Sequence, residues 1–151
     1  MIKLGAKELR TTIPSKKQIK KIKKNPIYIV LDNVLDTYNI GSIFRLADAV
    51  AAKKVYLCGG TATPPNHRIK KASINTTEWV GWSYSETADG AVREIREKIP
   101  NIQIVAVEQS KRSVPYDQFD YKLPIALVVG HESEGVSKEV LEICDAIVEL
   151  P

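Results

Sequence analysis

The feature that most constrains the fold is a regular alternation of short apolar runs with longer, more polar segments. Continuous apolar runs rich in β-branched residues are typical of strands that are covered on both faces. Five such runs are present, at 27–32, 54–58, 102–108, 125–130 and 146–150. Strands that alternate with helices favour a parallel sheet with right-handed crossovers. The sequence therefore predicts an α/β fold, a parallel sheet with helices on both faces.

The segments between these runs complete the expected Rossmann-like domain. Helices are expected at 39–50, 86–98 and 137–144, a short strand at 78–84, and loops at 61–72 and 109–124. With 151 residues, the chain suffices for one domain with a single core. Functional side chains in such a sheet lie at the carboxyl ends of the strands. The candidate segments are therefore 32–45, 59–71, 108–116 and 130–135.

Charge is distributed unevenly along the chain. Residues 1–24 carry nine lysines and arginines against Glu8 alone, a net charge of +8, whereas the whole chain carries +4. The remainder, 25–151, is therefore mildly acidic. We expect two parts, a basic helical arm at 1–24 and a globular domain at 25–151, with a helix that begins at Pro14-Ser15. Such an arm suggests a polyanionic partner, most often nucleic acid, although a solvated lysine-rich helix would look the same.

Cysteine content and hydropathy bear on the compartment. No apolar run approaches the roughly 18 residues that a membrane span needs, so no membrane partner is expected. Residues 1–13 do not resemble a signal peptide. Cys58 and Cys144 follow apolar residues without metal-type spacing, which favours buried reduced thiols over a disulfide. We therefore expect a cytoplasmic protein, and no metal site.

The glycine-containing turn "VVGHESEG" follows the strand expected at 125–130. It is no P-loop, because no Gly-Lys-Ser/Thr follows, and the chain has no G-x-G-x-x-G. Glu132 and Glu134 would also repel a phosphate. Gly130 and Gly135 fit a tight loop whose backbone approaches a neutral or cationic ligand, although a plain strand-to-helix turn has the same spacing.

The helix expected at 39–50 carries one arginine among apolar residues. Asn39 can cap this helix, and Gly41 and Arg45 share one of its faces. A glycine within a helix costs about 1 kcal/mol relative to alanine, which suggests that another segment packs closely against Gly41. Since an unpaired buried charge is costly, Arg45 should either face a ligand or pair with Asp32, Asp48 or Glu132.

These segments resemble a known family, the SpoU (TrmH-type) RNA ribose 2′-O-methyltransferases of the SPOUT class. "NIGSIFRLADA" is similar to the family's first motif, with Asn39, Gly41 and Arg45 in register. "LVVGHESEGVSKEVLEICDAIVELP" is similar to the second motif, with Gly130 and Glu132 in register, although His131 replaces the usual asparagine or proline. The resemblance extends from about Pro26 to Pro151.

The resemblance implies S-adenosylmethionine as cofactor and RNA, either tRNA or rRNA, as substrate. It assigns Arg45, Asn39 and Glu132 to catalysis, with Arg45 at the target phosphate, Asn39 orienting Arg45, and Glu132 holding the loop or the arginine. It places the cofactor against the backbone of Val107, Gly130 and Leu150. The basic end of the 61–72 segment, with Arg68, Lys70 and Lys71, would bind substrate.

The family's third motif, with its Ser-Leu-Asn segment and the helix that forms a trefoil knot, does not follow Pro151 in this sequence. From the resemblance we expect the missing segment to leave one wall of the cofactor pocket open and to disturb the homodimer usual in the family. Three functions therefore stay open: RNA ribose 2′-O-methyl transfer, RNA binding without methyl transfer and, should the resemblance not hold, the binding of a small ligand by an unrelated α/β domain.

Overall fold

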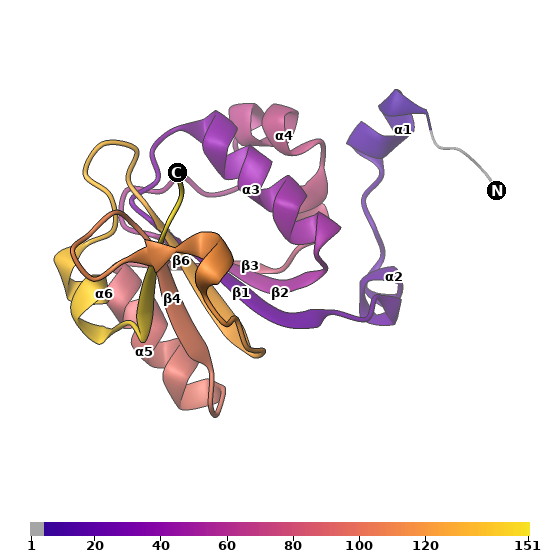
Figure 1. Ribbon diagram of the computed structural model, residues 1–151. Helices are drawn as coiled ribbons and strands as arrows, with labels where there is room; N and C mark the ends of the chain where they lie inside the picture. Colours follow the sequence, from indigo (N-terminus) through magenta and orange to yellow (C-terminus); the bar gives the residue numbers. More distant parts are fainter. Residues whose placement is uncertain (1–4) are drawn as a thin grey trace.

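A parallel sheet forms the centre of the molecule, which is described here by a computed structural model covering residues 5–151 (Figure 1). Seven strands pair in the order β3-β2-β1-β6-β4-β7-β5, and every pairing is parallel. The strands are β1 (Asn25–Asp32), β2 (Ala52–Cys58), β3 (Trp82–Ser85), β4 (Gln103–Val107), β5 (Val114–Pro115), β6 (Ile125–Gly130) and β7 (Ala146–Glu149). The predicted parallel α/β architecture is confirmed, as are all five predicted apolar strands.

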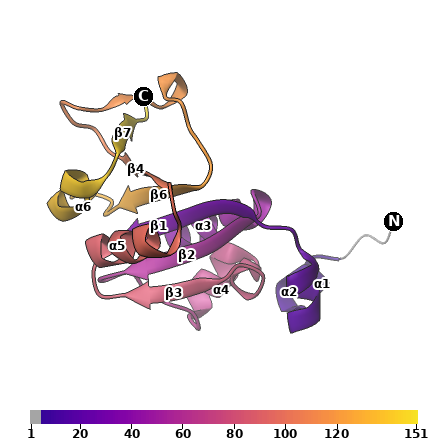
Figure 2. The ribbon, with the colours of Figure 1, turned by 90° about the horizontal axis from the view of Figure 1, so that it is seen from below.

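Helices cover both faces of this sheet, as predicted (Figures 1 and 2). They are α1 (Ala6–Thr11), α2 (Lys16–Lys21), α3 (Thr37–Ala49), α4 (His67–Ser73), α5 (Ala88–Lys98) and α6 (Lys138–Ile143), with short 3-10 turns at Thr76–Glu78 and Tyr116–Gln118. On one face α3 buries Phe44 in a cluster that includes Leu57 of β2 and Ile69 of α4. On the opposite face α5 and α6 bury Ile95 and Val140 against the other side of the strands.

The order of the strands identifies where a ligand should bind. The chain runs outward from β1 through β2 to β3, and then returns through α5 to β4 on the other side of β1. Strand β6 later fills the place between β1 and β4. A crevice forms at the carboxyl ends of the strands where the direction of winding reverses. In this sheet that point lies at the ends of β1 and β6.

The 61–72 segment departs from the predicted loop, because its second half forms helix α4. The Asn66 side chain caps this helix by accepting hydrogen bonds from the backbone N–H groups of Arg68 at 3.0 Å and Ile69 at 3.1 Å. Ile69 is fully buried beneath α3. A helix of seven residues that buries one large apolar side chain has too little periodicity to be recognised in the sequence.

The basic N-terminal segment folds as two short helices rather than one. Helix α2 begins after Ser15, as predicted, and Ser15 forms a capping box with Gln18. No residue of α1 or α2 is buried, but Pro14, which lies between the two helices, is buried. The backbone carbonyl of Thr12 accepts a hydrogen bond from the Asn75 side chain, which fixes the arm beside α4. The division into an arm and a domain stays a prediction.

Candidate functional site

The candidate site is built on the carboxyl ends of β1 and β6, which lie side by side. Asp32 ends β1 and stands in register with Gly130 at the end of β6. The Asp32 carboxylate is 2% exposed and accepts hydrogen bonds from the Ser137 backbone N–H at 2.8 Å and from the Asn33 side chain at 3.1 Å. Asp32 thereby ties the end of β1 to the segment that begins α6.

The two glycines of the loop after β6 lie in close contact with the protein's own chain. A Cβ atom on Gly130 would collide with the backbone of Gly135 and Val136. Gly135 has a φ of +73°, and a Cβ atom there would collide with the Glu108 carboxylate. The close approach of the chain to both glycines agrees with the predicted tight loop, and the approach of its backbone to a ligand stays a prediction. The two glycines allow the turn to close on itself, with paired backbone hydrogen bonds between His131 and Gly135.

Glu132 joins this loop to the beginning of α3. Its carboxylate accepts hydrogen bonds from the backbone N–H groups of Asp36 at 2.9 Å and Leu35 at 3.2 Å. Desolvation by itself would raise the pKa of Glu132, but these N–H groups and the Asn39 side chain outweigh it and lower that pKa. Glu132 is therefore anionic near neutral pH and holds the 33–36 loop in place. The resemblance implied that Glu132 holds either the loop or Arg45, and the structure shows the contact with the loop.

Asn39 has a different position from the predicted one. The cap of α3 is Asp36, whose side chain accepts a hydrogen bond from the Tyr38 backbone N–H at 2.8 Å, so the prediction that Asn39 caps the helix is wrong. Asn39 instead lies within the first turn of α3, close enough to Glu132 for its side chain to help lower the pKa of that carboxyl. Arg45 follows six residues later, about 120° away around the helix. The structure thus brings Asn39 and Glu132 together and leaves Arg45 on another face.

Arg45 is exposed on α3, and within residues 5–151 it forms no salt bridge. The alternative in which Arg45 pairs with a carboxylate is therefore not observed. The close contact predicted at Gly41 is confirmed, because a Cβ atom there would lie 2.5 Å from the Ala72 Cβ and 2.8 Å from the Ser73 backbone nitrogen. Gly41 thus lets α4 pack closely against α3.

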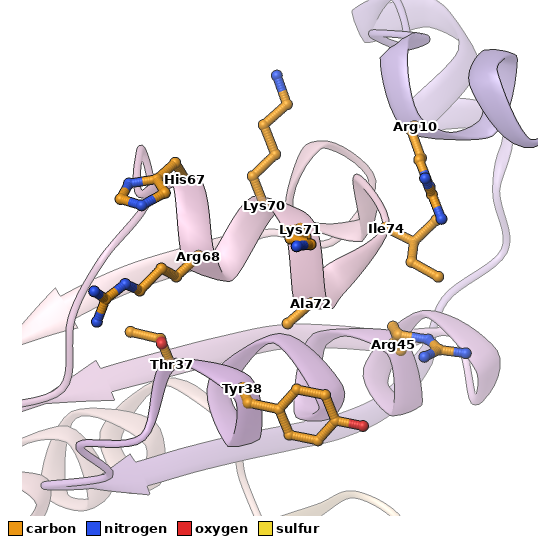
Figure 3. Close-up of a pocket in the computed structure, with 10 residues that line it drawn as sticks. All are labelled: Arg10, Thr37, Tyr38, Arg45, His67, Arg68, Lys70, Lys71, Ala72 and Ile74. Carbon is orange, nitrogen blue, oxygen red and sulfur yellow. The ribbon is translucent and has the colours of Figure 1, made fainter.

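The packing of α4 on α3 creates a basic groove beside Arg45. The groove has a volume of about 660 Å³ and contains no acidic side chain; its lining residues are Arg10, Thr37, Tyr38, Arg45, His67, Arg68, Lys70, Lys71, Ala72 and Ile74. Figure 3 shows Arg10 and Arg45 at one end of this basic groove and Arg68 beside Thr37 at the other. The predicted substrate-binding residues Arg68, Lys70 and Lys71 thus lie with Arg45, although Lys70 points away from α3 (Figure 3).

The three predicted cofactor-binding residues come together on neighbouring strands. Val107 ends β4 and is in register with a residue of each neighbouring strand. Its partner on β6 is Val129, which immediately precedes Gly130. Its partner on β7 is Val148, two positions before Leu150. A depression of about 360 Å³ lies at this edge; it is lined by Gln109, Pro115, Tyr116, Asp117, Glu149, Leu150 and Pro151. Leu150 therefore borders an open depression, whereas Gly130 closes its own loop.

Arg10 and Tyr38 are among the residues of the basic groove that were not predicted as site residues. Arg10 was assigned only to the arm, and its place opposite Arg45 depends on how the arm folds back. Tyr38 is 66% exposed and immediately precedes Asn39 of the first motif. An exposed tyrosine seven residues before Arg45 falls on nearly the same helix face, and this spacing could have identified it.

Metal-binding groups, membrane-spanning helices and cysteines are described for residues 5–151. No group of three or more His, Cys, Asp or Glu side chains is placed to hold a metal ion there. Over the same residues, every helix is too short or too polar to cross a membrane. Cys58 is buried, as predicted, whereas Cys144 is only half-buried, and the two are not joined to each other; the reduced state stays a prediction. Burial raises the pKa of the Cys58 thiol to about 12.

Comparison with known proteins agrees with this geometry. The chain is 35% identical over 133 residues to the tRNA (guanosine(18)-2′-O)-methyltransferase of Aquifex aeolicus, which covers 85% of this chain and 60% of that protein. It is 29% identical over 126 residues to the 23S rRNA (guanosine-2′-O-)-methyltransferase RlmB of Ralstonia nicotianae, covering 83% of this chain and 49% of that protein. The chain thus spans about half to three-fifths of the length of these relatives.

Solved structures show the same fold. The A. aeolicus TrmH/SpoU tRNA modifying enzyme superposes with a TM-score of 0.74 at 28% identity, over 97% of this chain and 69% of that one. The AdoMet-bound rRNA methyltransferase from Sinorhizobium meliloti superposes with a TM-score of 0.75 at 28% identity, over 95% of this chain and 51% of that one. The sequence profile of the SpoU rRNA Methylase family matches residues 26–151. The chain therefore belongs to the SpoU rRNA Methylase family.

Proposed function

We propose that the protein is an S-adenosylmethionine-dependent RNA ribose 2′-O-methyltransferase that acts on tRNA or rRNA. The observation that carries this proposal is the position of Arg45, which is exposed and without an ion pair among the described residues, in a groove free of acidic side chains. The two relatives named above act on guanosines of tRNA and 23S rRNA at the 2′-oxygen. The same family and the same fold support this chemistry here.

The depression at the edge of β4 and β7 suits S-adenosylmethionine in its chemistry. Asp117 and Glu149 give it negative charge for a sulfonium cation, and Leu150 gives it apolar surface. A solved relative, the S. meliloti enzyme, contains bound AdoMet. When bound, this cofactor supplies an activated methyl group to a nucleophile. We assign Val107, Gly130 and Leu150 to the strand ends that would hold it.

The residues of the basic groove would position the ribose that accepts the methyl group. Arg45, Arg68 and Lys71 would bind backbone phosphates, since guanidinium and ammonium groups are the common phosphate ligands. Arg45 would contact the phosphate next to the target ribose and stabilise negative charge that develops on the 2′-oxygen as its proton passes to solvent water. Holding the reactants in line would supply much of the rate, because a ribose hydroxyl is a weak nucleophile.

Asn39 and Glu132 would act on the loop rather than on the substrate. The two hydrogen bonds that Glu132 accepts hold the 33–36 loop against the turn after β6, and Asn39 lies close to this carboxylate. We therefore propose them as positioning residues that hold α3, and with it Arg45, at a fixed distance from the methyl donor.

A single variant tests the proposal. Arg45→Ala should abolish methyl transfer to bulk tRNA or rRNA, measured with isotopically labelled S-adenosylmethionine and confirmed as nuclease-resistant 2′-O-methyl linkages. Its free energy of unfolding should not change, because Arg45 is exposed and has no ion pair within residues 5–151. Arg93→Ala is the matched control, since Arg93 lies on α5 across the sheet and pairs with Asp89 at 2.6 Å.

The alternative function, RNA binding without methyl transfer, gives a different result. Calorimetry would then detect no binding of S-adenosylmethionine, whereas RNA binding would persist and would still depend on Arg45. A homodimer and a cytoplasmic location remain predictions, and light scattering on the purified protein tests the first.

A further inference from the structure

Tyr38 is the most exposed aromatic side chain of the sheet-flanking helices, at 66% exposure. It lies in the first turn of α3, on nearly the same helix face as Arg45 and about 10 Å from it along the axis. Both residues line the basic groove, and Figure 3 shows the Tyr38 ring projecting from α3 into the open. An aromatic ring is therefore displayed among cationic side chains.

Two other exposed tyrosines, Tyr84 and Tyr121, are held by the fold, whereas Tyr116 lies in the depression beside Leu150 and away from the basic groove. The Tyr84 hydroxyl donates a hydrogen bond to the Gly59 carbonyl at 2.8 Å, and the Tyr121 hydroxyl donates to the Tyr116 carbonyl at 2.7 Å. Tyr121 also packs edge-to-face on Phe119. The Tyr38 hydroxyl has no such partner within residues 5–151, so no structural contact in that range accounts for the ring's position.

We propose that Tyr38 is a stacking platform for an unpaired nucleobase, and that the basic groove therefore binds single-stranded or looped RNA rather than a duplex. This inference rests on the proposed function and deepens it by naming the substrate class. Proteins that bind single-stranded nucleic acid combine a cationic groove along the backbone with aromatic rings on which bases stack. A duplex offers no free base face to such a ring.

The position of Tyr38 relates the base to the reaction. Asp36, two residues before Tyr38, binds Glu132 through its backbone N–H. Along the chain and the axis of α3, Tyr38 therefore lies between Arg45 and the strand ends where the cofactor is proposed to bind. A base stacked on its ring would leave flanking phosphates within the span of Arg45 on one side and Arg68 on the other (Figure 3). The ring would thus select an unpaired nucleotide and hold it near the methyl donor.

The test measures RNA binding without cofactor, so that it does not depend on methyl transfer. A short single-stranded RNA with one 2-aminopurine and a duplex of equal length are titrated with wild type, Tyr38→Ala and Tyr38→Phe. For the single strand, Tyr38→Ala should weaken binding at least about fivefold and remove the quenching of 2-aminopurine, whereas Tyr38→Phe should keep both. Duplex binding should be the same for all three proteins.

Salt dependence gives a second readout. Tyr38 carries no charge, so Tyr38→Ala should leave the slope of log Kd against log salt unchanged while affinity falls. Tyr84→Ala is the matched control and should bind the single strand like wild type. Equal affinity of Tyr38→Ala and wild type for the single strand, or an equal loss for strand and duplex, would overturn the inference. If the basic groove bound neither the single strand nor the duplex, the inference would be overturned as well, and a protein would become the expected partner of this face.

The failure of the proposed function would look different. The protein would then bind single-stranded RNA with the Tyr38 dependence described above but would transfer no methyl group to any RNA. Thermal unfolding of each Tyr38 variant should match wild type, because the side chain is exposed.

Discussion

The carboxylate of Glu132, in the turn after β6, accepts a 2.9 Å hydrogen bond from the backbone N–H of Asp36, the residue that caps α3. This contact joins two segments that are 96 positions apart in the sequence. It connects the edge where the cofactor is proposed to bind with the helix that carries Arg45. The spacing between these two parts of the site therefore depends on one exposed carboxylate.

Replacement of Glu132 by glutamine should loosen this connection. We expect Glu132→Gln to lower the free energy of unfolding at pH 7 by about 0.5–1 kcal/mol, a small value because the group is largely solvent-exposed. The pKa of Glu132 is lowered in the folded state, so its contribution is present above the ordinary value of 4.5 and is lost as pH falls through the folded-state pKa. Urea unfolding of both proteins across this range should show the difference disappear in acid.

Glu134→Gln provides the control for that experiment. Glu134 lies in the same turn, and within residues 5–151 its carboxylate accepts no hydrogen bond. Its replacement should leave stability and its pH dependence close to wild type. A similar loss in both variants would mean that loop charge, and not the contact with Asp36, is responsible.

Gly41→Ala should force α3 and α4 apart. The added Cβ would lie 2.5 Å from the Ala72 Cβ and 2.9 Å from the Ala72 carbonyl carbon, so the backbone of α4 must move. Overpacking of this kind costs about 1–3 kcal/mol, and the gain of about 1 kcal/mol in helix propensity offsets only part of it. Chemical denaturation measures the net loss. Gly81→Ala should be tolerated, since its Cβ would meet only the Lys53 carbonyl at 3.5 Å.

Asn66→Ala should weaken α4 and disturb Arg68 with it. Loss of the two cap hydrogen bonds should cost about 1 kcal/mol in the free energy of unfolding. RNA affinity should fall as well, because the first turn of α4 carries Arg68. Ser137→Ala is a matched control, since Ser137 caps α6 without a side-chain hydrogen bond. If both variants lose equal stability, capping by Asn66 is not what holds α4.

Arg10→Gln and Arg68→Gln should each reduce the salt dependence of RNA binding. A contact with one phosphate contributes about 0.7 to the slope of log affinity against log salt for a single strand. Deletion of residues 1–24 should flatten the slope further. Lys98→Gln is the control, because Lys98 lies on α5 and pairs with Glu94 at 2.5 Å. An unchanged slope on deletion would mean that the basic arm is only a solvated surface.

The sequence alone determined the sheet and its helical cover. Val30, Ile104 and Val128 lie in continuous apolar runs and are fully buried on central strands. Such runs are recognisable because a strand covered on both faces needs apolar residues on both sides. Capping by Ser15 was also predictable, since a capping box lies within four consecutive residues. The sequence also placed Arg45 on a helix and Glu132 in the turn after an apolar strand, and the structure has them on α3 and after β6.

The tertiary structure alone decided how the site is assembled. Helix α3 is capped by Asp36 rather than Asn39, and Glu132 from a distant turn binds the loop that leads into this helix. The basic groove gathers Arg10, Arg45 and Arg68 from three helices. Exposed charges follow no helical or strand period, and contacts between remote segments leave no local pattern. Only the packing of α4 on Gly41 and the return of the arm bring these cations to one surface.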